Sequence, residues 1–153
     1  MFGRMDCMTM KYIAPYILRQ EYECHHCHSL PCEIFGDWVD YPWFYFSLFE
    51  AFGNFRKAWG KPVNITSGYR CLERNKEVGG VLLSVHIFGG ALDMKFRDDE
   101  ETANAARAID DTSPFLRMGV YLHGQSRLHV DVGYLVIPKM REAWVAGARW
   151  GDR

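Results

Sequence analysis

The sequence has no apolar run that approaches the roughly 20 residues needed to cross a bilayer as a helix. Residues 1–7 also lack the charged start and apolar stretch of a secretory signal peptide. We therefore expect a protein that is synthesised in the cytoplasm without a signal peptide and does not insert into a membrane.

An excess of charge of one sign is also missing. The formal net charge is −1, and acidic and basic residues are interspersed along the chain. No basic field is therefore available to hold a phosphate backbone, and we expect no nucleic-acid partner.

Internal repeats and low-complexity segments are absent too, and 153 residues is the size of one domain. The oligomeric state is left open.

Cysteine is scarce and its number, five, is odd. In a chain without an export signal, clustered cysteines are more often reduced or metal-bound than disulfide-bonded. A closed structural zinc site would use Cys24, Cys27 and Cys32 with one neighbouring histidine, and would pin the N-terminal segment. The histidines available for this are His25, His26 and His28. The alternative is a loop of reduced cysteines.

Strand-like alternation begins at Ala91, where every second residue is apolar. On a half-buried strand, Asp93 then points away from the core. The pair Gly89 and Gly90 lets the backbone turn sharply just before this strand. This turn would bring His86 back beside Asp93.

The same alternation recurs at residues 127–132 and 118–123. It places His129 and Asp131 on the polar face of one strand and His123 on the polar face of the other. Glycine in the turn between them predicts a hairpin. Every candidate ligand therefore lies on the polar face of a sheet.

Two imidazoles and one carboxylate, from His86, Asp93 and His129, can hold zinc and leave its fourth position open to water. Zinc with an open position lowers the pKa of its bound water and polarises a carbonyl group, so the pattern predicts hydrolysis. A single histidine beside a strand is more often a surface residue. The metal-free alternative treats all three as unrelated surface residues, and the joint pattern argues against it.

The remaining pattern predicts helices between these strands, and hence an α+β fold. An aromatic stripe at helical spacing indicates a core helix within residues 38–59 that begins near Pro42. The other expected elements are a strand at 63–67, a short helix at 72–78, a helix that starts with the acidic run at 98–101, and a closing helix at 140–148.

Several motifs occur together in one order: Ser67-Gly68-Tyr69-Arg70, Asn75, Val78-Gly79-Gly80, Ser84-x-His86-x-x-Gly89-x-Ala91-x-Asp93, Gly119-x-Tyr121 and His129-x-Asp131. In combination they resemble the zinc D-Ala-D-Ala carboxypeptidase family, over residues 22–131. That family includes phage endolysins, and it shares its fold with the hedgehog signalling domain. The resemblance implies a small antiparallel sheet with helices packed on one face and a zinc site on the other.

The resemblance also implies an activity. It is zinc-dependent hydrolysis of peptide bonds in peptidoglycan stem peptides, as a carboxypeptidase or endopeptidase, at the bacterial cell wall or within a phage particle. Arg70 and Ser84 are the implied contacts to the polar groups of the substrate, since the planar fork of arginine suits a carboxylate. Without the resemblance, a surface Arg70 paired with Glu73 or Glu77 would be the simpler reading.

The general base is the weak point of the match. Many family members have an acid three residues before the last zinc histidine, where this chain has Ser126. Two residues on the polar face are candidates, His123 and Asp131, and we slightly favour His123. Asp131 can equally orient a ligand imidazole.

The missing acid leaves a second function open, a catalytically inactive zinc-containing binding or structural module of a virion or cell surface. For the enzyme, we expect one domain over residues 1–153. It would comprise an N-terminal segment at 1–35, a catalytic core at 36–137 and a C-terminal helix at 138–153.

Overall fold

A five-stranded sheet is the centre of the molecule. The computed structural model describes residues 10–31, 33, 44–136 and 145–152. The strand order is β3-β4-β6-β5-β7, and all neighbours are antiparallel except β5 and β7. The strands are β3 Asn64–Ser67, β4 Ala91–Lys95, β5 Arg117–Tyr121, β6 Arg127–Asp131 and β7 Arg149–Gly151. A separate hairpin pairs β1 Tyr12–Ala14 with β2 Ile17–Leu18.

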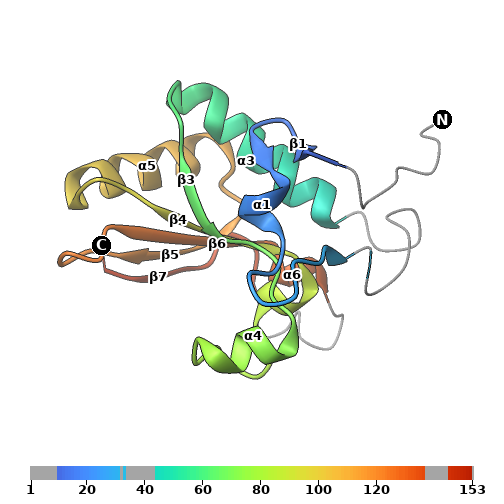
Figure 1. Cartoon of the computed structure of the whole chain (residues 1–153). Coiled ribbons are helices and arrows are strands. Elements are labelled where there is room, and N and C mark those ends of the chain that lie inside the picture. Colours follow the sequence, from blue (N-terminus) through green and yellow to red (C-terminus); the bar gives the residue numbers. More distant parts are fainter. Residues whose placement is uncertain (1–9, 32, 34–43, 137–144, 153) are drawn as a thin grey trace.

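Two long helices, α3 Phe44–Trp59 and α5 Asp99–Thr112, lie on the same side of this sheet (Figure 1). The buried aromatic side chains of α3 form part of the core together with the apolar residues of the central strands. The carboxylate of Asp98 caps α5 by accepting a hydrogen bond from the amide of Glu101. The predicted aromatic helix and the helix after the acidic run are therefore confirmed, as is the α+β fold.

The short helices are α1 Arg19–Tyr22, α4 Leu72–Glu77, the 3-10 helix η1 Val85–Phe88 and α6 Gly133–Val136. In Figure 1, α4 and α6 lie away from the two long helices, whereas α1 lies beside β3, with Tyr22 against Phe49 of α3. The predicted short helix after Arg70 corresponds to α4.

Register decides which side chains meet. Asp93 on β4 is directly opposite His129 on β6, and His129 is opposite Gly119 on β5. Their neighbours Leu92 and Val130 are buried in the core. Asp93 and His129 thus share the face that points away from the long helices, as the alternation predicts.

The C-terminal region differs from the expectation. The closing helix predicted to reach Ala148, and extended to 153 in the domain assignment, is wrong for the described part, because residues 145–148 form a turn and Arg149–Gly151 form β7. Residues 140–144 lie outside the described part. The amide of Met118 donates to the carbonyl of Ala148, so pairing with β5 outweighs local helix propensity. β7 also makes the sheet mixed at one edge.

No helix in the described ranges is both long and apolar enough to cross a membrane.

Truncating Phe55 to alanine is expected to lower the free energy of unfolding by about 3–5 kcal/mol, because the ring is lost from a packed core. The Phe55 side chain is buried, and its ring lies 6.1 Å from Phe52 and 5.9 Å from Trp59 between centroids. Urea denaturation measures the change. Phe46→Ala on the same helix is the control, since Phe46 is 57% exposed and should change stability by less than about 1 kcal/mol. Equal effects of the two substitutions would contradict this packing.

Candidate metal centre

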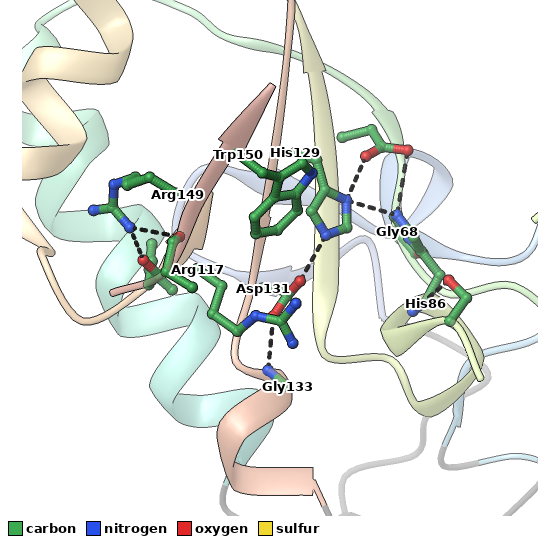
Figure 2. Close-up of polar contacts among 12 residues, drawn as sticks. Gly68, His86, Arg117, His129, Asp131, Gly133, Arg149 and Trp150 are labelled. Carbon is green, nitrogen blue, oxygen red and sulfur yellow. Dashed lines mark hydrogen bonds and ion pairs between the residues drawn. The ribbon is translucent and has the colours of Figure 1, made fainter. Parts of the chain in front are cut away.

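The donor atoms of three side chains converge beside the polar face of the sheet. His86 lies on η1, Asp93 on β4 and His129 on β6. His86 Nε2 is 3.3 Å from His129 Nδ1 and 3.2 Å from Asp93 Oδ2, and His129 Nδ1 is 2.9 Å from Asp93 Oδ1. Figure 2 shows His129 between His86 and Asp131.

The spacing of these donors suits a tetrahedral metal. With bonds of about 2.0–2.1 Å to nitrogen and oxygen, two zinc ligands are separated by about 3.3 Å. The three observed separations are close to that value, and the group is the one set of imidazole and carboxylate donors in the described residues that converges in this way. The three predicted ligands are thus brought together, and they can hold a metal ion.

The His86 side chain and backbone are both fixed by hydrogen bonds. Its Nδ1 is 2.6 Å from the carbonyl oxygen of Gly68, which makes it the donor there and leaves Nε2 with a free lone pair. The hydroxyl of Ser84 accepts a hydrogen bond from the His86 amide at 3.3 Å. Gly89 ends η1 with a left-handed φ of 76°, and the chain then enters β4. The predicted glycine turn therefore returns His86 to Asp93.

His129 is oriented by Asp131. Its Nε2 is 2.7 Å from Asp131 Oδ2, and the other oxygen of that carboxylate accepts a hydrogen bond from the Gly133 amide at 2.8 Å. Arg117 lies 3.5 Å from the same oxygen. Asp131 is buried and lies across the imidazole ring from the converging donors (Figure 2). This is the arrangement by which a carboxylate orients a metal-binding histidine.

Arg70 contacts the third donor. Its Nη2 donates to Asp93 Oδ2 at 3.1 Å, while Nη1 donates to Asn75 Oδ1 and Nε to Ser67 Oγ. The pairing with Glu73 or Glu77 that would mark a surface arginine is replaced by this ion pair. Arg70 and Ser84 therefore both support metal donors, and their contact to a substrate stays a prediction.

The protonation states follow from these contacts. Burial alone would lower the pKa of His129, but hydrogen bonds to Asp131 and Asp93 outweigh it and raise the pKa to about 9. Burial would raise the pKa of Asp93, yet hydrogen bonds from His129 and His86 hold it far below its usual value. Burial lowers the pKa of His86. At neutral pH, His129 is thus an imidazolium between two carboxylates, and His86 is neutral.

Zinc binding at pH 7 is therefore expected to release about one proton per chain, because the proton on His129 Nδ1 must leave before a metal can bind there. The affinity should rise with pH and level off above the His129 pKa of about 9. Calorimetric titrations in buffers of different ionisation enthalpy count the protons. Binding at pH 7 without proton release would contradict this protonation state.

His123, the other residue considered as the general base, has different surroundings from Asp131. His123 lies in the β5–β6 turn with a φ of 54°, and its side chain is 84% exposed, with Nε2 3.6 Å from Asp152 Oδ1. It lies two residues beyond the end of β5 at Tyr121, past the strand residue Gly119 that is opposite His129. Within the described part of the chain, His123 makes no hydrogen bond or ion pair with the metal donors, and its exposed position argues against the role of base that was predicted for it from the sequence.

Ser126 occupies the position where many family members have an acid. Its hydroxyl donates to Asp99 Oδ1 at 2.8 Å, on the side of α5 and not on that of the donors. Its φ is 48°. The hydrogen bond to Asp99 therefore connects the start of α5 to the β5–β6 hairpin.

Trp150 is a residue of the site that sequence reasoning missed. Its ring centroid lies 5.6 Å from that of His129, and its Nε1 donates to the hydroxyl of Tyr121 at 3.0 Å. A side chain on Gly119 would collide with Trp150, because a Cβ there would lie 2.6 Å from Nε1. The glycine in the Gly119-x-Tyr121 motif therefore lets the indole lie against His129, and that motif was the available signal.

The described residues include two of the three cysteines that were predicted to bind a structural zinc ion. Cys32 lies outside the described residues, but the sulfurs of Cys24 and Cys27 lie within 4.8 Å of each other and of Cys71. Burial would raise the pKa of Cys24, but hydrogen bonds from the amides of Cys71, Cys27 and His26 give a net lowering. Burial and the neighbouring Cys24 raise the pKa of Cys71 to about 12. Cys71 was not among the predicted ligands.

Comparison with known proteins agrees with this geometry. A search of curated proteins gave no match. A family model described as Peptidase M15 matches residues 30–131, which is more than half of the chain and includes His86, Asp93 and His129. The chain therefore belongs to the Peptidase M15 family.

Proposed function

We propose that this protein is a zinc-dependent peptidase that hydrolyses peptide bonds in the stem peptides of peptidoglycan, as a carboxypeptidase or an endopeptidase. The family supports a metallopeptidase. The observation that carries the proposal is the convergence of donor atoms from His86, Asp93 and His129: the two imidazole nitrogens are 3.3 Å apart, and each lies 2.9–3.2 Å from one of the two oxygens of Asp93. Three protein ligands leave one position of a tetrahedral metal for water or substrate.

Each donor is fixed by a partner of its own. The Gly68 carbonyl sets the tautomer of His86, Asp131 sets that of His129, and Arg70 holds the carboxylate of Asp93. A bound zinc ion would supply an activated water and polarise the scissile carbonyl. The chain's contribution is to hold the three donors at ligand spacing with few rotational alternatives, which lowers the cost of organising the site.

Cationic side chains beside the donors support an anionic substrate. Arg127 lies two residues before His129 on the same face of β6, with its guanidinium 4.4 Å from the ring centroid of Tyr121. Its Nε is buried and has no hydrogen-bond partner within the described part of the chain. Stem peptides carry free carboxylates, for which a guanidinium is a suitable partner. We assign Arg127, together with the predicted contact Arg70, to substrate binding.

The second candidate function is a zinc-containing module that binds cell walls without cleaving them. The observation that favours it is Ser126, which replaces the acid and faces Asp99. A serine hydroxyl cannot accept a proton usefully near neutral pH. This module would bind walls and release nothing.

Incubation with isolated bacterial cell walls distinguishes the two functions. We expect new amino termini and soluble peptides in the presence of zinc, and none after a chelator is added. His129→Ala is the matched control, because it removes one donor. Wall binding without released peptides under zinc-replete conditions would overturn the peptidase and favour the module.

A further inference from the structure

A second group of metal-type donors shares no residue with the His86 group. The sulfurs of Cys24, Cys27 and Cys71 all lie within 4.8 Å of one another. Zinc with four donors and bonds of about 2.3 Å to sulfur separates its sulfurs by about 3.8 Å. All three cysteines are free thiols, and they range from buried to exposed.

Two segments distant in the sequence build this group. After α1, the Cys24 amide donates to the Ser29 carbonyl at 3.0 Å and the His28 amide to the Cys24 carbonyl at 2.7 Å, so the chain folds back in a tight loop that carries Cys27. Cys71 is the residue directly before α4. Its own amide donates to the sulfur of Cys24 at 3.3 Å, and its sulfur accepts from the Arg74 amide at 3.5 Å. Backbone amides directed at sulfur favour the thiolate form, which binds metals. At Cys71, whose pKa is raised to about 12 by burial and Cys24, a bound metal ion would have to displace the proton.

We propose that Cys24, Cys27 and Cys71 bind a second zinc ion as thiolates, and that this ion has a structural role. A fourth donor, from the protein or from solvent, completes the tetrahedron. A disulfide joins only two sulfurs and gives no reason for a third to lie beside them, whereas a metal site requires several. The proposal does not rest on peptidase activity.

The cluster stands next to the supports of the first metal centre. Cys71 directly follows Arg70, whose amide donates to the carbonyl of His86 at 3.0 Å. In the segment that carries Cys24, the Tyr22 carbonyl accepts from the Tyr69 amide at 2.7 Å, and the Tyr22 hydroxyl donates to the Gly89 carbonyl at 2.6 Å. A metal that joins the loop after α1 to the start of α4 would therefore fasten the segment that carries Gly68 and Arg70.

The test is a metal count on the full chain, purified with reductant and zinc and then freed of loosely bound metal. We expect two zinc ions per chain for the unmodified protein and one for Cys71→Ser. Cys7→Ser, which changes a cysteine outside the proposed set, should retain two. A single zinc ion in the unmodified protein that Cys71→Ser retains, or two zinc ions in Cys71→Ser, would overturn the proposal.

A spectroscopic measurement on the unmodified chain tests thiolate ligation without relying on a cysteine variant. Cobalt(II) added to the metal-free chain should produce a thiolate-to-cobalt charge-transfer band, and this band should persist in His129→Ala, in which the first centre is removed. The absence of the band in the fully reduced chain would exclude thiolate ligation. A thiol count two below that of the reduced chain, with no metal bound, would identify a disulfide instead. Failure of the peptidase assay would leave both readouts unaffected.

Discussion

Replacing His129 with alanine is expected to remove the metal of the His86 group and to lower turnover at least roughly a thousandfold. A metal that acts as a Lewis acid lowers the activation barrier by several kcal/mol, and each 1.4 kcal/mol changes the rate by about a factor of ten. His129 supplies a donor 2.9 Å from Asp93 and 3.3 Å from His86, so alanine leaves two protein ligands. Elemental analysis and peptide release from cell walls measure the two effects.

The matched control is His123→Ala. Both histidines belong to the β5–β6 hairpin, but His123 is 84% exposed and faces Asp152. We expect His123→Ala to retain its zinc and to keep turnover within about twofold, since a surface substitution leaves the site intact. A loss of about two to four orders of magnitude in turnover with zinc retained would instead identify His123 as the general base. That result would contradict the site described above.

Asp131→Asn is the second substitution with a large expected effect. Loss of a carboxylate that orients a metal-binding histidine weakens metal binding by about 10–100-fold. The effect arises because Asp131 accepts from His129 Nε2 at 2.7 Å and fixes which nitrogen faces the metal. Turnover at limiting zinc should fall in parallel. Competition with a chromogenic chelator gives the affinity, and Asp111→Asn, at an exposed position of α5, is the control.

A proton count separates this positioning role from a general loss of stability. Asp131 is one of the two carboxylates that raise the His129 pKa to about 9. Without its charge, the pKa of His129 in the metal-free chain should fall, so less than one proton is released when zinc binds at pH 7. An unchanged proton release in Asp131→Asn would show that Asp131 does not act through His129.

The donors of the metal centre could be predicted because their signal is local. Period-two alternation placed Asp93 and His129 on one face of neighbouring strands, and the glycine pair explained how His86 returns to Asp93. Periodicity also predicted β5 and the aromatic helix α3, while β-branched composition predicted β3, a glycine stop predicted α4 and the acidic first turn predicted α5. The metal ligands therefore needed only residue types and periodicity.

The features that could not be predicted depend on contacts between residues that are distant in the sequence. Arg70 pairs with Asp93 across 23 positions, and Cys71 joins cysteines more than 40 positions away. β7 is too short for any periodicity and forms because it pairs with β5. Asp131 and His123 both lay on the predicted polar face, but only tertiary geometry separates a carboxylate bonded to a ligand imidazole from a histidine in an exposed turn.

An anomalous-scattering map at the zinc edge, from crystals grown with zinc, tests the metal centre most directly. We expect a peak about 2.0–2.2 Å from His86 Nε2, His129 Nδ1 and a carboxylate oxygen of Asp93, with solvent in the fourth position. A map without a peak among these atoms, or with a fourth protein side chain bound to the metal there, would contradict this expectation.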